Sequence, residues 1–190
     1  LQIDPKAMAM LKEHVGMDIS RIVKEIDKLK VSMGVNERVV TDTHIEQYIG
    51  LSKEYNTFEL NDAVLKQDVG RAMRIAEHFA HNPKTYPITL TITILFGLFQ
   101  QLFLLNYHMW QSRKRGIPMP ADAELMRAIR ANNPFAVKEL KANIGRWSGP
   151  RLFKILGYLR EYDAKSKGVD SGGLDGGELL KELLLKIFMS

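Results

Sequence analysis

The sequence predicts an all-α protein, and three observations support this. The stretch from Pro87 to Trp110 carries no charged residue and is the most apolar part of the chain. Elsewhere, apolar residues recur at helical spacing in shorter segments. Most of these segments begin at a helix-capping residue or at proline and end at glycine. The pattern predicts helices packed around one apolar central helix, and it predicts no β-strand.

Two other interpretations of the central stretch have to be weighed. Residues 88–94 alternate between apolar residues and threonine, which is typical of a β-strand. The apolar residues continue to Leu105, however, which is too long for an ordinary strand, and Pro87 suits the first turn of a helix. The run is also long enough to span a membrane, but threonine and glutamine dilute it and no second apolar segment accompanies it. We interpret the stretch as a buried helix.

The composition is that of a folded protein with a moderate positive charge. The chain has 190 residues, 45% of them hydrophobic, which is enough for a core and argues against disorder. A net charge of +5 permits binding to nucleic acid or to an acidic protein without requiring either. Cysteine is absent, which excludes disulfides and is compatible with a reducing, cytoplasmic location. The chain begins with Leu1 and without a secretory signal, and we expect it to be a piece of a longer protein.

Three short amphipathic helices are predicted near the start of the chain. The first begins at Asp4-Pro5, which places a cap before a proline at the first helical position. The third begins at Thr43 to Glu46, which has the pattern of a capping box. The predicted segments run from Asp4 to Gly16, from Asp18 to Gly34 and from Thr43 to Gly50. So small a bundle buries little surface, and we expect it to depend on a neighbouring part of the protein.

A longer series of helices is predicted to follow. Asn82-Pro83 breaks the chain before the central helix, and a glycine-rich loop over residues 168–177 precedes the last helix. The expected helix caps are Asn56 to Glu59, Asp68, Ser148 and Asp175. In the helix that begins at Asn133-Pro134, the side chains expected to be buried are Phe135, Val137, Leu140 and Ile144.

The search for catalytic chemistry is negative. His78 and His81 are three residues apart, but a zinc site needs further ligands and the chain offers no cysteine. The loop from Gly168 to Gly177 resembles a phosphate loop only in its glycine content. No Gly-x-Ser-x-Gly segment and no pattern typical of a catalytic triad is found. We therefore predict no catalytic residue, no cofactor and no metal.

Two basic clusters remain after this search. Arg113 to Arg115 leave the central helix together, and a second cluster lies near the start of the following long helix. Next to aromatic residues, the second cluster could track the phosphates of a nucleic acid. It could equally be a solvated helix surface whose aromatic neighbours lie in the core. The candidate nucleic-acid contacts are Arg146, Arg151 and Lys154, and the neighbouring aromatic residues are Trp147, Phe153 and Tyr158.

Several segments together resemble the delta subunit of the bacterial DNA polymerase III clamp loader. Each segment is short, and their order and spacing across nearly the whole chain carry the resemblance. The segment from Asn56 to Ala63 supplies the family-motif residues Phe58, Glu59, Leu60, Asp62 and Ala63. The other segments are Ile3 to Leu29, Val39 to Ile49, Asn133 to Lys138 and Glu161 to Gly168.

The resemblance implies a chain made of two helical parts. Residues 1–53 would be a three-helix lid, which is the C-terminal part of an AAA+-type module. Residues 54–190 would be a helical collar that mediates oligomerisation. In this family the collar joins five related subunits into a ring that loads the sliding clamp onto primed DNA, as part of the DNA polymerase III holoenzyme, a nucleotidyltransferase. Delta does not hydrolyse ATP in this family, and it opens the clamp through an N-terminal domain that we expect to lie outside these residues.

The expected function is therefore assembly with other clamp-loader subunits, and two alternatives stay open. A helical nucleic-acid-binding module would use the basic residues between Arg146 and Lys167. A lid fragment of an active AAA+ ATPase would instead contribute contacts to a bound nucleotide.

Overall fold

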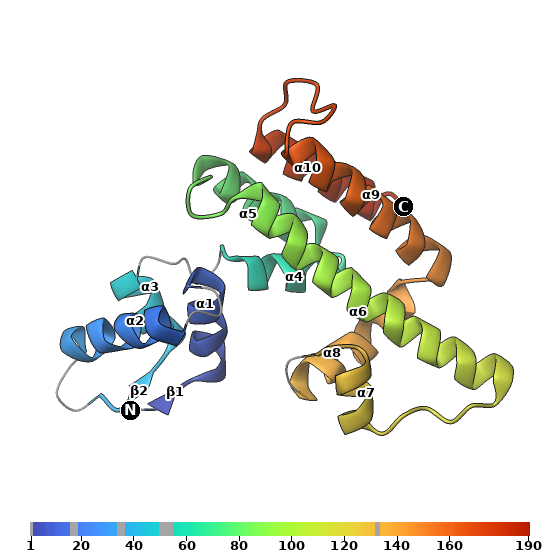
Figure 1. Cartoon of the computed structure of the whole chain (residues 1–190), viewed down its shortest axis with the longest axis horizontal. Helices are drawn as coiled ribbons and strands as arrows, with labels where there is room; N and C mark the ends of the chain where they lie inside the picture. Colours follow the sequence, from blue (N-terminus) through green and yellow to red (C-terminus); the bar gives the residue numbers. More distant parts are fainter. Residues whose placement is uncertain (1, 16–18, 34–36, 50–54, 132–133) are drawn as a thin grey trace. The chain divides into compact units, whose positions relative to one another are not determined.

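The computed structural model describes residues 2–15, 19–33, 37–49, 55–131 and 134–190 (Figure 1). Within these ranges the secondary structure consists of ten α-helices, one short 3-10 helix and two strands of two residues each, so the predicted all-α fold is confirmed. The chain divides into two units, Leu1–Leu60 and Asn61–Ser190. The predicted domain boundary at residues 53 and 54 lies outside the described residues and stays a prediction.

The first unit contains three helices and one pair of very short strands. The helices are α1 (Pro5–Val15), α2 (Ile19–Ser32) and α3 (Asp42–Ile49), and the strands are β1 (Gln2–Ile3) and β2 (Val39–Val40). β1 and β2 pair in parallel, with Gln2 opposite Val39. The sequence did not predict them, because two residues are too few to display the alternation that identifies a strand. The core of this unit consists of Ala7, Met10, Leu11, Leu29, Met33, Val40 and Ile45.

The start of α3 differs from the prediction. The helix begins at Asp42, and the backbone N–H of Thr41 donates to Nδ1 of His44 over 3.0 Å. His44 thus takes the position that glutamate occupies in a capping box with Thr41 as the cap. The capping box predicted from Thr43 to Glu46 is therefore wrong, because the sequence pattern for a capping box includes only glutamate or glutamine at this position.

Most of the other predicted helix caps are confirmed. The side-chain oxygen of each cap accepts a hydrogen bond from a backbone N–H two or three residues later. These caps are Asp4, Asn56, Asp68, Ser148 and Asp175. Asp175 and Glu178 form a complete capping box. The helix ends predicted at Gly16, Asp18, Gly34, Gly50 and Asn133 lie outside the described residues.

The second unit is a bundle in which one long helix occupies the centre (Figure 1). α6 packs against α9, α10 packs against α5 and α9, and α7 packs against α8. α9 begins beside the later part of α6, where Gly149 lies against Asn106, and α10 begins beside the start of α6, where Gly176 lies against Ile88. The helices of this part of the chain are α4 (Thr57–Lys66), which crosses the unit boundary, α5 (Val69–His81), α6 (Ile88–Arg115), α7 (Asp122–Ala128), α8 (Pro134–Asn143), η1 (Ile144–Arg146), α9 (Gly149–Ser166) and α10 (Gly176–Phe188).

The helical interpretation of the central stretch is confirmed by α6. The hydroxyls of the threonines that suggested a strand donate hydrogen bonds to backbone carbonyls one turn earlier in the helix. Thr91 donates to the Pro87 carbonyl over 3.2 Å and Thr93 to the Thr89 carbonyl over 2.9 Å. Among the described helices, α6 is the one long and apolar enough to cross a membrane, and one of its faces is buried in the bundle. The buried residues are Thr91, Ile92, Leu95, Leu98, Phe99, Leu102 and Leu105.

One residue predicted to be in the core is exposed. Val137, Leu140 and Ile144 are buried as predicted, but the side chain of Phe135 is 65% exposed. Phe135 lies two positions before Val137, which in a helix of 3.6 residues per turn places it on nearly the opposite face. The prediction is therefore wrong because it relied on apolar character alone.

Candidate functional site

The family-motif residues of α4 divide into core positions and an ion-pair cluster. Leu60 and Ala63 are fully buried, whereas Phe58 is 47% exposed. Asp62 accepts from Arg71 on α5 over 2.9 Å and pairs with Lys66 over 2.6 Å. Its hydrogen bond with Lys66 raises the pKa of that lysine, although burial opposes the shift. The bond between Asp62 and Arg71 therefore ties α4 to α5.

Glu59 is the remaining motif residue, and it is mostly buried. Its backbone N–H donates to the Asn56 side chain over 2.9 Å at the start of α4. Within the first unit, its carboxylate lies 3.4 Å from Nζ of Lys6, which also pairs with Asp42 over 3.2 Å. The role of the motif in assembly stays a prediction.

Of the three candidate nucleic-acid contacts, Arg151 is engaged within the fold. Its guanidinium donates to the carbonyls of Ile187 and Phe188 at the end of α10, over 3.2 and 3.3 Å, and to that of Arg146 over 3.0 Å. It also lies over the Trp147 ring at 4.4 Å from the centroid. Burial lowers the pKa of Arg151. These contacts give Arg151 a structural task, because the last carbonyls of a helix lack partners within the helix.

Arg146 and Lys154 are exposed, whereas Arg151 is half-buried. Lys154 lies 5.7 Å from the centre of the Tyr158 ring, and neither residue pairs with a carboxylate in the described part of the chain. Among the aromatic neighbours, Trp147 is buried whereas Phe153 is 73% exposed. The aromatic neighbours are therefore divided between core and surface, and contact of this cluster with nucleic acid stays a prediction.

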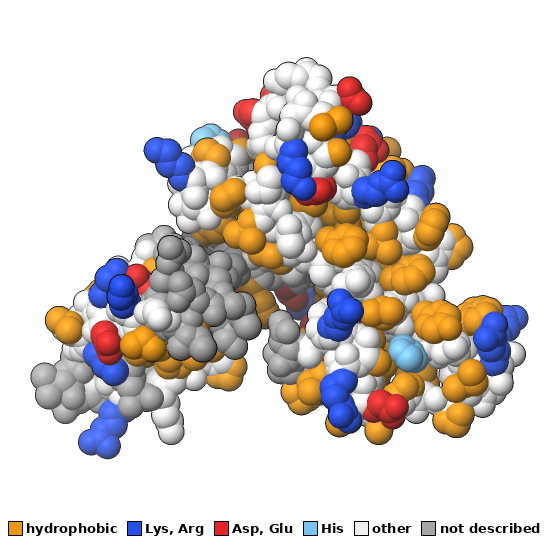
Figure 2. Space-filling view, viewed as in Figure 1, with side chains coloured by type: hydrophobic (Ala, Val, Ile, Leu, Met, Phe, Trp, Pro, Cys, Tyr) orange, Lys and Arg blue, Asp and Glu red, His pale blue; other side chains and the backbone are white. Residues whose placement is uncertain are grey.

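A row of partly exposed aromatic side chains along α6 was not predicted from the sequence. We call Phe96, Phe103, Tyr107 and Trp110 the α6 stripe. Phe96, Tyr107 and Trp110 are 42%, 45% and 44% exposed, and the rings of Tyr107 and Trp110 stack at 6.3 Å between centroids. Figure 2 shows apolar side chains gathered over α6. The signal was present as aromatic residues three, four and seven positions apart, but in an uncharged run they resembled core residues.

The α6 stripe ends at a basic segment, which we call the α6 basic end (Arg113, Lys114 and Arg115). All three side chains are exposed, and the Arg115 guanidinium lies 5.1 Å from the centre of the Trp110 ring. Arg113 and Lys114 line a shallow pocket beside η1 that has no acidic residue in its lining. The other lining residues are Asn106, Met109, Trp110, Ile144, Gly145, Trp147 and Ser148.

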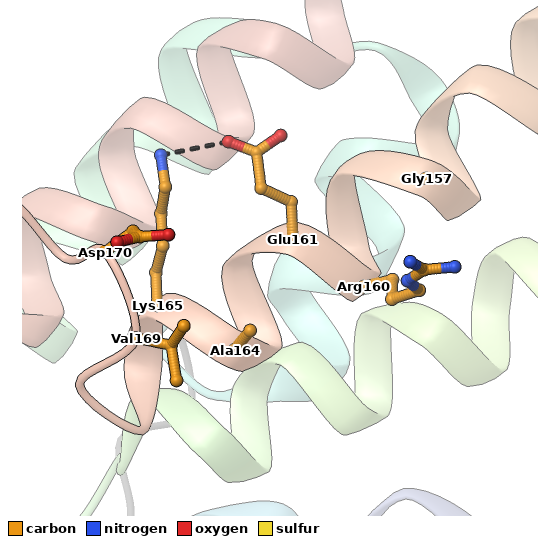
Figure 3. Close-up of a pocket in the computed structure, with 7 residues that line it drawn as sticks. All are labelled: Gly157, Arg160, Glu161, Ala164, Lys165, Val169 and Asp170. Carbon is orange, nitrogen blue, oxygen red and sulfur yellow. Dashed lines mark ion pairs between the residues drawn. The ribbon is translucent and has the colours of Figure 1, made fainter.

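A second pocket lies between α9 and the loop that follows it (Figure 3). Glu161 and Lys165 pair there over 2.9 Å, and this hydrogen bond lowers the pKa of Glu161. Arg160 extends away from the pair in Figure 3. The rest of the lining consists of Gly157, Ala164, Val169 and Asp170. Glu161 and Lys165 in this pocket are therefore partners of each other.

Comparisons with known proteins identify the class of fold. No protein-family model matches the chain, and a comparison with curated proteins finds no match. A structural comparison gives the chain a clamp-loader-like fold.

The solved structure that carries this result is a Bacillus subtilis DNA clamp loader delta protein (YqeN). The match has a TM-score of 0.62 and 20% sequence identity, and it covers 99% of this chain. The chain corresponds to 51% of the length of that protein. The similarity therefore extends over both units of this chain and over about half of the solved one.

Proposed function

We propose that this chain is the lid and collar region of a clamp-loader subunit of the delta type. The observation that carries the proposal is the structural match to a clamp loader delta protein over 99% of the chain. A fold can host unrelated functions, so the match is weighed together with the motif residues. The order and spacing of those residues along the chain resemble the same family independently of the fold.

In this role the chain assembles with other clamp-loader subunits in the cytoplasm. Residues 1–53 act as the lid and residues 54–190 as the collar that joins a hetero-pentamer. The assembled delta subunit opens the sliding clamp and loads it on primed DNA, and the loader works as part of the DNA polymerase III holoenzyme. The chain contributes no catalytic residue and no cofactor. Its exposed apolar side chains on α6 are suited to contacts between subunits.

Reconstitution with purified proteins tests this proposal. The chain is mixed with each purified clamp-loader subunit from the same source, and complexes are separated by size-exclusion chromatography at moderate salt. Co-elution with at least one loader subunit supports the proposal. If no subunit co-elutes, while primed DNA binds tightly with a steep salt dependence, the nucleic-acid-binding alternative is favoured.

Two further measurements separate the alternatives. Arg146→Glu and Lys154→Glu weaken DNA binding if this cluster tracks phosphates, because each loses one cation at the contact. Lys138→Glu, on the exposed surface of α8, is the matched control for a non-specific charge effect. Binding of ATP, measured by equilibrium dialysis on the longest form of the protein, distinguishes the ATPase alternative.

A further inference from the structure

The α6 stripe presents an apolar surface of definite length. From Phe96 to Trp110 it covers fourteen helical steps, or about 21 Å at 1.5 Å per residue. Three of its four side chains are more than 40% exposed. Exposed apolar patches of this kind mark contact sites, because their burial by a partner removes apolar surface from water.

The neighbouring face of α6 is buried and holds this surface in place. Leu95, Phe99 and Leu102 alternate with the stripe residues along the helix and are buried in the bundle. Phe99 packs edge-on against Trp147, with 5.3 Å between ring centroids. The stripe therefore projects from a helix anchored in the bundle core, and binding does not require the backbone to be ordered first.

Charge is confined to one end of the stripe. α6 contains no aspartate or glutamate, and its lysine and arginine residues all lie in the α6 basic end. In the described part of the chain, no carboxylate pairs with Arg113, Lys114 or Arg115. A complementary partner therefore has an apolar surface about 21 Å long and acidic groups at one end of it.

We propose that the α6 stripe binds an amphipathic helix of a partner protein, whose apolar face covers the four aromatic side chains and whose acidic residues meet the α6 basic end. A helix of about fourteen residues has the required length, and helices commonly recognise apolar grooves through residues at this spacing. The inference rests on the proposed function for the identity of the partner, which is another clamp-loader subunit.

Two other occupants fit the surface less well. A single-stranded nucleic acid needs cations along its whole track, but α6 has no lysine or arginine before Arg113. A second copy of this chain would place the α6 basic end of one protomer against residues 88–96 of the other in an antiparallel pairing, or against the other basic end in a parallel pairing. Neither surface offers a carboxylate.

The first arm of the test uses purified clamp-loader subunits. We compare wild type with the double variant Tyr107→Ala/Trp110→Ala and with the triple variant Arg113→Glu/Lys114→Glu/Arg115→Glu. Phe135→Ala is the matched control, because it removes an exposed aromatic side chain outside the stripe. Circular dichroism establishes that each variant is folded. We expect the dissociation constant to rise at least about tenfold for the aromatic variant, as for a central aromatic contact, and no more than twofold for the control.

The second arm does not depend on the proposed function. Two synthetic eighteen-residue amphipathic helices have the same leucine face, and one carries three glutamates at an end where the other carries three lysines. Titration is followed by the fluorescence of Trp110, which is exposed. We expect the glutamate peptide to bind more tightly than the lysine peptide, with the preference reversed in the triple charge variant, which replaces three cations by three anions.

Each outcome decides between the two proposals. If loader subunits bind and the aromatic variant binds equally well, the inference is overturned and the proposed function stands. If no loader subunit binds, the proposed function fails and the peptides alone decide the inference. Equal binding of both peptides, or of neither, overturns it. Binding of oligo(dT) that is lost in the aromatic variant, or a dimer in sedimentation that the same variant dissociates, also overturns it.

Discussion

The two tryptophans of this chain lie in surroundings of similar composition and opposite exposure. Trp147 has an aromatic neighbour, Phe99, and an arginine, Arg151, over its ring. Trp110 likewise has Tyr107 stacked on it and an arginine over its ring. The difference is burial: Trp147 is 1% exposed and Trp110 is 44% exposed. We call these groups the Trp147 site and the Trp110 site.

The polar groups of the two sites have different partners. At the Trp147 site, the indole N–H donates to the Leu65 carbonyl over 3.1 Å and Arg151 donates to the end of α10. At the Trp110 site, Arg115 makes no ion pair in the described part of the chain. Aromatic and cationic groups thus stabilise the fold where their polar atoms are satisfied internally. They are suited to partner binding where those atoms remain exposed.

The largest expected effect is at the Trp147 site. Trp147→Ala removes a buried ring between α6 and α9 and leaves the Leu65 carbonyl without its indole donor. We expect a loss of about 3–5 kcal/mol in the free energy of unfolding, as for other buried tryptophans replaced by alanine. Urea unfolding followed by circular dichroism measures this loss. A loss similar to that of Trp110→Ala would show that the contrast between the sites is wrong.

A smaller loss of stability is expected when the arginine beside each tryptophan, Arg151 or Arg115, is replaced by methionine. Arg151→Met keeps apolar contact with the Trp147 ring but removes the donors to Ile187, Phe188 and Arg146. We expect a loss of about 1.5–3 kcal/mol, since hydrogen bonds to charged groups are in this range and water replaces some of them. Arg115→Met should change stability by no more than about 0.5 kcal/mol, as at other exposed sites. Equal losses in the two variants would contradict the assignment of Arg151 to the fold.

The comparison of Arg151 with the helix caps shows which interactions could be predicted from the sequence. Helix caps such as Asp68, Ser148 and Asp175 were predicted correctly because a cap acts on its own first turn, which the sequence displays directly. Arg151 looked equivalent to Arg146 and Lys154 in a basic cluster. Its actual partners lie 36 and 37 positions further along the chain, and no local pattern specifies them.

The exposure of the Trp110 site was not predicted from the sequence, for a related reason. The uncharged stretch predicted a buried helix correctly, but composition does not distinguish two faces when both are apolar. Phe99 and Phe103 are only four positions apart, yet Phe99 is fully buried and Phe103 belongs to the α6 stripe. The same limitation put Phe135 in the predicted core. Which apolar face of a helix is covered depends on the helices packed around it, and these are fixed only by the tertiary structure.

Asn106 links the two sites, and its removal should have an intermediate effect. Its side-chain amide donates to the carbonyl of Trp147 over 3.3 Å, one turn before Trp110 on α6. We expect Asn106→Ala to lower the free energy of unfolding by about 0.5–1.5 kcal/mol, the usual range for one neutral hydrogen bond. Urea unfolding measures the loss. In double variants, the stability change of Asn106→Ala should be coupled to that of Arg151→Met and additive with that of Arg115→Met. The reverse pattern would contradict the assignment of Arg151 to the fold and of Arg115 to the exposed surface.

The smallest expected effect on stability is at the Trp110 site. Trp110→Phe keeps a ring beside Tyr107 and should change the free energy of unfolding by no more than about 0.5 kcal/mol. Because the chain has two tryptophans, this variant also leaves Trp147 as the sole indole fluorophore. Its emission should shift to shorter wavelength than that of wild type and should resist quenching by acrylamide, since Trp147 is 1% exposed. Strong quenching in the variant would mean that the Trp147 site opens to solvent, and burial would then no longer separate the two sites.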